Sequence, residues 1–153
     1  MGENQGKILV IDDDRDIRIT AQMLLKKHFG EVEVWERPGK PEQGESIGDF
    51  DVVLLDMNFT PGASNGEEGL YWIREITRNH PDMAVVVITA YGDVNIAVQA
   101  MKLGAIDFVV KPWENQRFLT TVQSAYRLGQ SRREISNLRS TRETLQNDMD
   151  QAS

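Results

Sequence analysis

The sequence predicts an α/β fold in which five parallel strands form a doubly wound sheet and an extended helix follows at the C-terminal end. Two patterns lead to this prediction. Five short apolar segments alternate with segments whose apolar residues recur at helical spacing, and such alternation is typical of parallel βαβ units. Residues 52–55 are apolar without interruption, as in a strand that helices cover on both faces.

The expected strands are short apolar segments bounded by turn-forming or charged residues. They cover residues 7–11, 32–35, 50–56, 83–88 and 106–110. Residues 32–35 alternate apolar and polar side chains, which indicates a second strand soon after the first helix. Lys111 and Pro112 end the last strand.

The expected helices lie between these strands. The first follows three aspartates and runs to Gly30, and either Asp13 or Asp14 can cap it because carboxylates accept hydrogen bonds from the amides of a helix start. Further helices are expected over residues 69–79 and 93–103 and from about Glu114 onward. Residues 37–49 contain two prolines and three glycines, so a loop with at most one short helix is expected there.

The residues after Leu128 differ in pattern from the rest of the chain. An a/d heptad frame runs through Leu128, Ser131, Ile135, Leu138, Arg142, Leu145 and Met149. With two polar members the frame makes roughly three imperfect heptads, which is marginal for a coiled coil. We expect residues 1–128 to form the domain and residues 129–153 a helical linker. Two interpretations of the linker stay open, a helix continuous with the domain or a frayed tail.

Composition excludes several classes of protein. A chain of 153 residues with 40% hydrophobic residues can form one core. The net charge of −7 argues against direct nucleic-acid binding, and the absence of cysteine excludes disulfides and thiolate metal sites. No apolar run approaches the roughly 20 residues of a membrane helix, and the first residues lack an apolar secretory segment. We therefore expect a cytoplasmic protein.

Polar side chains gather where the expected strands end. Asp12, Asp13, Asp56, Thr89 and Lys111 all follow or end an apolar segment. Since the carboxyl ends of parallel strands meet at one edge of a sheet, we expect these five residues to converge. Three clustered carboxylates repel one another, and a hard cation such as Mg²⁺, which prefers oxygen ligands, relieves that repulsion.

This set of groups suits in-line transfer of a phosphoryl group. Asp56 can act as a nucleophile and form an aspartyl phosphate. A metal ion neutralises the phosphoryl oxygens, the Lys111 ammonium adds positive charge and the Thr89 hydroxyl donates a hydrogen bond. Each residue has an ordinary explanation when taken alone, such as a surface charge for Lys111. Only the joint pattern predicts the chemistry.

Four segments carry a resemblance to a known family. ILVIDDD, DVVLLD, VVVITAYGD and GAIDFVVKP occur in this order and resemble the receiver domain of bacterial two-component response regulators, over about residues 7–128. The resemblance implies a flavodoxin-like fold and a signalling domain, which is not an enzyme beyond its own phosphoryl transfer and slow dephosphorylation. It also implies that Asp56 accepts a phosphoryl group from a sensor histidine kinase.

The resemblance implies a Mg²⁺ site built around Asp56. Asp12 and Asp13 are the further carboxylates, with Asp13 favoured as the direct ligand. The backbone carbonyl of Asn58 completes the protein ligands. Mg²⁺ is therefore the expected cofactor.

The resemblance also implies a switch. Lys111 contacts the phosphoryl group, Thr89 turns toward it after phosphorylation, and the aromatic Phe108 moves inward when Thr89 moves. The surface around Thr89, Phe108 and the last helix then changes and controls an output domain or partner. The Lys111–Pro112 peptide bond is expected to be cis, since cis bonds are largely a feature of proline.

Residues 92–115 most resemble the receivers of enhancer-binding transcription activators, which assemble as oligomers. A homodimer through the helix of residues 128–149 is therefore a further hypothesis. No ATPase or DNA-binding domain is recognisable in the sequence. We accordingly expect either a fragment of a longer regulator or a receiver that acts alone.

Two features depart from the family pattern. Pro61 is the fifth residue after Asp56, one later than usual, and Gly69 lies about five residues late for a compact loop. These shifts indicate an insertion around residues 60–68, beside the phosphorylation site, that either affects partner choice or covers the site. In addition, the segment of the usual second helix is rich in glycine and proline.

Two other functions compete with the switch. A Mg²⁺-dependent phosphatase of the haloacid-dehalogenase type carries its Asp nucleophile in an Asp-x-Asp-x-Thr pattern, but residues 56–60 are Asp-Met-Asn-Phe-Thr. The missing second acid and the small size of the chain disfavour this function. A scaffold that binds partners without phosphorylation would not need the acidic cluster or Lys111.

Overall fold

The computed structural model describes residues 5–39, 46–57 and 67–152. Within these residues the chain forms five strands, four α-helices and one short 3₁₀ helix. The strands are β1 (Lys7–Ile11), β2 (Glu31–Trp35), β3 (Val52–Asp56), β4 (Ala84–Ala90) and β5 (Asp107–Lys111). The helices are α1 (Arg15–Lys26), η1 (Ile47–Asp49), α2 (Glu67–Asn79), α3 (Val94–Lys102) and α4 (Asn115–Ala152).

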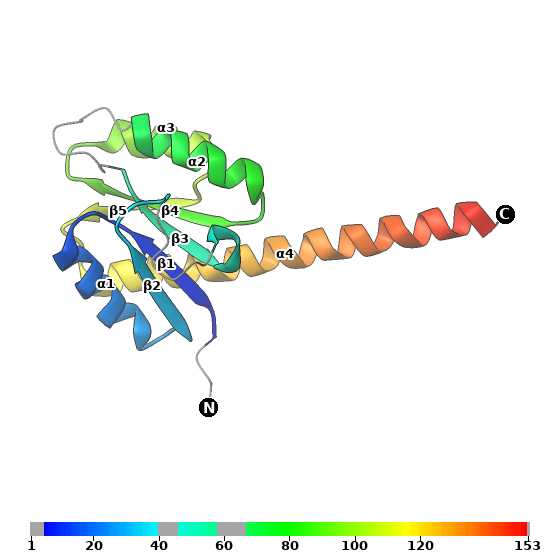
Figure 1. Cartoon of the computed structure of the whole chain (residues 1–153), viewed down its shortest axis with the longest axis horizontal. Helices are drawn as coiled ribbons and strands as arrows, with labels where there is room; N and C mark the ends of the chain where they lie inside the picture. Colours follow the sequence, from blue (N-terminus) through cyan, green and yellow to red (C-terminus); the bar gives the residue numbers. More distant parts are fainter. Residues whose placement is uncertain (1–4, 40–45, 58–66, 153) are drawn as a thin grey trace.

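The five strands form one parallel sheet in the order β2-β1-β3-β4-β5. Helix α1 and the first part of α4 cover one face of the sheet, and α2 and α3 cover the other (Figure 1). The predicted fold class, a doubly wound and flavodoxin-like α/β fold, is confirmed. Among the helices of the described ranges, none is long and apolar enough to cross a membrane.

Strand β3 lies at the centre of the sheet and is buried on both faces. Val52 and Leu54 belong to the core cluster under α1 and α4, whereas Val53 and Leu55 belong to the cluster under α2 and α3. Side chains alternate between the two faces of a strand. A strand between two helical layers therefore needs an apolar residue at every position, which explains the uninterrupted apolar segment of the sequence.

The ends of several elements differ from expectation. Strand β4 continues through Thr89 and Ala90, because Thr89 pairs with Val110 and Ala90 with Lys111 of β5. Helix α2 begins at Glu67, two residues before the expected start. Of the residues expected to form a loop with at most a short helix, 40–45 lie outside the described residues, and Ile47–Asp49 form the short helix η1.

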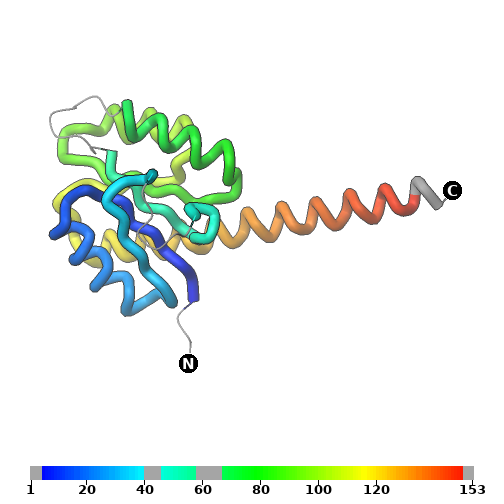
Figure 2. Tube along the Cα trace, viewed as in Figure 1, coloured from blue at the N-terminus to red at the C-terminus, as the bar shows by residue number. Residues whose placement is uncertain are grey.

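Helix α4 is one continuous helix through Ala152, so the interpretation of the linker as a frayed tail is wrong. Its first part packs on the sheet, where Phe118 and Val122 are fully buried. Its second part leaves the domain and projects past the amino ends of the strands (Figure 2). The helix thus has a core half and a half that is mostly exposed.

Candidate functional site

The register of the sheet brings three strand ends together at its carboxyl edge. Ile11 of β1 lies opposite Leu55 of β3, so the residues that follow them, Asp12 and Asp56, are neighbours. On its other side β3 pairs with β4, and β4 pairs with β5, which ends at Lys111. Acidic and basic side chains from strands far apart in the sequence therefore meet at this edge.

A cluster of three carboxylates lies at the carboxyl edge. Asp12, Asp13 and Asp56 each place one oxygen so that the three oxygens lie within 4.8 Å of one another. Asp12 and Asp56 are 0% and 1% exposed, whereas Asp13 is half-buried. Like charges repel strongly where water is excluded, so this cluster needs positive charge nearby.

Lys111 supplies positive charge from the end of β5. Its Nζ lies 2.8 Å from Oδ2 of Asp12 and 3.5 Å from Oδ1 of Asp56. Burial raises the pKa of the Asp12 carboxyl and outweighs the opposing effects of Lys111 and of the Asp14 amide. Burial alone would lower the pKa of Lys111, but its hydrogen bonds and charge interactions with Asp12 and Asp56 outweigh burial and raise it. The Lys111–Pro112 peptide bond is cis, as expected.

The backbone around Asp12 is held by three hydrogen bonds. Its N–H donates to the carbonyl of Trp35 at the end of β2 (3.1 Å), and its Oδ1 accepts from the N–H of Asp14 (2.9 Å). Its carbonyl accepts from Nη1 of Arg18 (2.8 Å). None of the sequence patterns indicated Arg18. Its place one turn into the helix that follows the aspartates is the signal that points to it, because a side chain there can reach back to the loop.

Asp14 caps helix α1 and does not belong to the carboxylate cluster. Its side chain accepts hydrogen bonds from the N–H groups of Asp16 (2.9 Å) and Ile17 (3.4 Å). Of the two expected caps, Asp13 and Asp14, the structure therefore selects Asp14. This cap turns the chain into the helix directly after the two aspartates of the cluster.

The remaining expected site residues are Thr89, Phe108 and Asn58. Thr89 is buried in β4, and its hydroxyl donates a hydrogen bond of 3.5 Å to the carbonyl of Asp93, just before α3. Phe108 is half-buried in β5 and packs against the core cluster under α2 and α3. Asn58 lies outside the described residues, as do residues 60–66 of the expected insertion.

The donor atoms of the cluster fit a hard divalent cation. Mg²⁺ binds through a small number of carboxylates and keeps several waters, and the cluster offers three carboxylate oxygens. Its oxygen-only donor set differs from the imidazole and thiolate sets that select transition metals. The residues that could hold the ion are Asp12, Asp13 and Asp56. Such an ion would lie beside a buried carboxylate and the Lys111 ammonium, which are the groups that phosphoryl transfer needs.

The sequence of this chain is similar to a known family and to known proteins. The family model described as the response regulator receiver domain matches residues 8–123. The chain belongs to this family. The receiver is 33% identical over 135 residues to the C4-dicarboxylate transport transcriptional regulatory protein DctD of Rhizobium meliloti, a match that covers 88% of the chain and 28% of DctD. It is 35% identical over 129 residues to the response regulator protein PilR of Pseudomonas aeruginosa, with 82% of the chain and 27% of PilR covered.

Solved structures show the same relationship. The N-terminal signal receiver domain of a two-component system response regulator from Bacteroides fragilis is 42% identical with a TM-score of 0.69, and the match covers 80% of this chain and 98% of that one. NtrX from Brucella abortus, solved in complex with ATP, is 29% identical with a TM-score of 0.74, and 88% of this chain and 29% of NtrX are covered. The chain thus spans less than a third of the length of DctD, PilR and NtrX.

The contacts of Lys111 predict an electrostatic contribution to stability. In metal-free protein, Lys111→Met leaves the buried Asp12 and Asp56 without their ammonium partner, and we expect a loss of about 3 kcal/mol in the free energy of unfolding at pH 7. The pKa of Lys111 is raised above its ordinary value of 10.5. Its contribution is therefore complete below pH 10.5 and is lost as the pH rises through the pKa in the folded protein. Urea unfolding in chelator-containing buffer between pH 7 and pH 11 measures this.

The matched control for this prediction is Lys102→Met, which removes an equal charge from the exposed end of α3. We expect it to cost less than about 1 kcal/mol, as for a cation near a helix C-terminus. A difference between wild type and Lys111→Met that stays constant up to pH 11 would contradict the assignment of the loss to the lysine charge.

Proposed function

We propose that this receiver accepts a phosphoryl group on Asp56 from a phosphohistidine of a sensor histidine kinase, with Mg²⁺ bound at the carboxylate cluster. The supporting observation is the buried Asp56 carboxylate, which lies beside two further carboxylates and 3.5 Å from the Lys111 ammonium. An oxygen of Asp56 attacks the phosphorus, and the P–N bond breaks with its electron pair returning to the imidazole nitrogen. The product is an acyl phosphate on Asp56.

The side chains of the cluster have separate roles in this proposal. Asp12, Asp13 and Asp56 would hold the metal ion, and the expected further ligand, the backbone carbonyl of Asn58, lies outside the described residues. The bound ion supplies positive charge to the phosphoryl oxygens. Lys111 contacts the same oxygens, because its compact ammonium group stabilises the negative charge on the phosphoryl oxygens during transfer.

We further propose that movements of the Thr89 and Phe108 side chains couple phosphorylation of Asp56 to a change in the surface of the domain. The hydrogen bond of Thr89 to the Asp93 carbonyl is 3.5 Å long, so the hydroxyl loses little by turning to a phosphoryl oxygen. Phe108 is half-buried in the edge strand β5 and packs against the core cluster under α2 and α3, so its ring can turn inward without giving up a fully buried position. The changed surface of β5 and α4 would then control an output domain or partner.

The second half of α4 supports a proposal about assembly. We propose that residues 1–128 are the phosphoacceptor domain and that residues 129–153 are a helical linker that pairs with the linker of a second copy. Within this linker four apolar side chains of the heptad frame are exposed in the single chain: Ile135 (50%), Leu138 (63%), Leu145 (59%) and Met149 (67%). These side chains form an apolar stripe along the helix. Pairing of two such helices would bury the apolar stripe.

The acceptor assignment predicts a single covalent product. Incubation with Mg²⁺ and a small acyl-phosphate donor should add one phosphoryl group to the wild-type chain, whereas Asp56→Asn should gain none because the amide is not a nucleophile. Intact-mass spectrometry measures both. Hydrogen exchange of the backbone amides of residues 89–93 and 107–111, measured on the same samples, tests the switch. Equal exchange rates in the phosphorylated and the unmodified chain would contradict it.

Two results would contradict the acceptor assignment. One is phosphorylation of Asp56→Asn to the extent seen for wild type. The other is a wild-type chain that gains no phosphoryl group from the small donor or from any sensor kinase tested, which would favour the scaffold function. Release of many equivalents of phosphate from a phosphate ester would instead favour the phosphatase.

The metal assignment predicts that adjacent aspartates behave differently. Asp13→Asn should weaken Mg²⁺ binding roughly tenfold or more, because it removes a carboxylate from the ligand set. Asp14→Asn should leave the affinity unchanged, because Asp14 caps α1 and asparagine caps a helix equally well. Isothermal titration calorimetry compares the two variants. Equal weakening by both would mean that only the net charge of the loop matters.

The assembly proposal predicts a dimer that depends on the apolar stripe. Sedimentation equilibrium should show reversible dimers of the wild-type chain and monomers of Leu138→Glu, because a carboxylate on the stripe cannot be buried in the pair. Asn137→Glu adds the same charge at an exposed position outside the a/d stripe and should leave the dimer intact. A wild-type chain that stays monomeric with and without a phosphoryl analogue would refute the pairing.

A further inference from the structure

Asp51 directly precedes β3, at the opposite edge of the sheet from the carboxylate cluster. Three donors from distant parts of the chain meet on its carboxylate. The N–H of Lys7 donates to Oδ2 (2.8 Å), the Nε2 of Gln130 donates to Oδ1 (3.4 Å), and the Nη1 of Arg133 forms an ion pair with Oδ1. The start of β1 and the middle of α4 are thereby tied to the start of β3.

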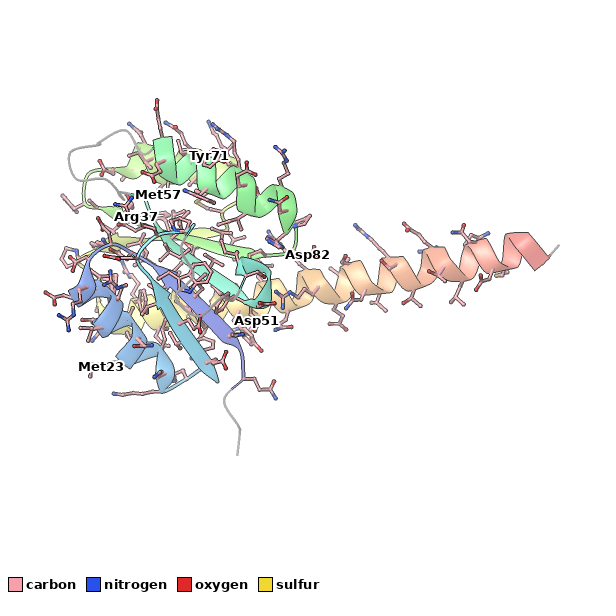
Figure 3. All side chains as sticks on the ribbon, in the orientation of Figure 1. Met23, Arg37, Asp51, Met57, Tyr71 and Asp82 are labelled. Atoms are coloured by element: carbon pink, nitrogen blue, oxygen red, sulfur yellow. The ribbon has the colours of Figure 1, made fainter. Side chains whose placement is uncertain are left out.

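Arg133 makes a second contact at the same place. Its Nη2 donates a hydrogen bond of 2.9 Å to the carbonyl of Phe50, next to Asp51. The planar fork of one guanidinium is thus shared between a carboxylate and a main-chain carbonyl, a geometry that fixes direction as well as distance. Figure 3 labels Asp51 where α4 passes the edge of the sheet before it projects from the domain.

Gly129 occupies the position in α4 just before these contacts. A Cβ at residue 129 would lie 3.2 Å from the Cβ of Ala84 and 3.6 Å from the carbonyl oxygen of Asp51. Glycine therefore lets the helix approach the amino ends of β3 and β4 closely. Glycine is also a poor helix former, so the helix is intrinsically weakest where it leaves the domain.

We propose that Asp51, Gln130 and Arg133 form a clamp that makes the exposed part of α4 a rigid continuation of the domain. With the clamp closed, residues 134–149 keep one direction relative to the sheet. With the clamp open, the chain bends at Gly129. The clamp therefore determines how narrowly the direction of the projecting helix is fixed relative to the domain. It does not depend on phosphorylation or on the metal site.

The partial exposure of the clamp decides how it can be tested. The side chains of Arg133 and Asp51 are 35% and 19% exposed, so the ion pair is accessible to salt and its removal leaves no deeply buried charge. Variants of Arg133 should therefore still fold. The effect of the clamp is then a change in the distribution of helix directions rather than a loss of the domain.

Distances between spin labels measure that distribution. The chain has no cysteine, so Arg74→Cys on α2 and Ser140→Cys on α4 give two unique and exposed labelling sites. Labelled chain is diluted into an excess of unlabelled chain so that only distances within one molecule contribute. We expect one narrow distance distribution for the clamped chain and at least a twofold broader one for Arg133→Gln.

Two comparisons make the test specific. Arg133→Lys keeps a positive charge for Asp51 but lacks the fork that also reaches Phe50, so its distribution should be of intermediate width. Arg132→Gln removes the same charge from the neighbouring half-buried arginine and should stay as narrow as the wild type. A broad distribution for the wild type, or equal widths for the wild type and Arg133→Gln, would overturn the proposal. Equal broadening by Arg132→Gln and Arg133→Gln would overturn it as well.

Discussion

Two carboxylates, Asp12 and Asp56, are buried side by side at the end of a parallel sheet, and one ammonium, that of Lys111, lies between them. Such burial is unfavourable unless each charge has a partner at close range. The partner comes from β5, two strands away from β3. The site therefore depends on the register of four strands, because the pairings β1–β3, β3–β4 and β4–β5 together bring the three side chains to one place.

The cluster is not neutral even with Lys111 in place. With every group ionised, three carboxylates contribute −3 and the lysine contributes +1, which leaves −2. This is the charge that one divalent cation would balance. The two core clusters, with their fully buried side chains from β1, β3 and β4, provide the stability that offsets the remaining repulsion in the absence of an ion. Under the proposed function, a bound cation or a phosphoryl group on Asp56 would change the local charge at this site.

The sequence predicts the sheet and the charged cluster well because both depend on local patterns. The apolar segment 52–55 and the residues at strand ends follow from the alternation of strand side chains and from the geometry of parallel sheets. The extension of β4 to Ala90 depends on pairing with β5, which no local pattern of β4 reveals. Arg18 was missed for a similar reason, since its role comes from a contact with a main-chain carbonyl.

The course of α4 could not be decided from the sequence. Its heptad frame has polar residues at two positions, so periodicity alone left a continuous helix and a frayed tail equally acceptable. At the edge of the domain Gln130 and Arg133 of this helix contact Asp51, and Arg133 and Asp51 are 82 residues apart in the chain. In the sequence Asp51 is an isolated polar residue within the expected strand 50–56, and its role appears only in the fold, where three donors contact its carboxylate.

Helix α4 begins at the carboxyl edge of the sheet, crosses one face and leaves at the amino edge (Figure 1). Between the two edges lies the length of β3, which at five residues spans roughly 16 Å. Two proteins would therefore approach from opposite edges of the sheet if one contacted Asp56 and the other bound the projecting helix. Neither would have to leave before the other arrives, so a donor and a recipient of the signal could occupy one receiver at the same time.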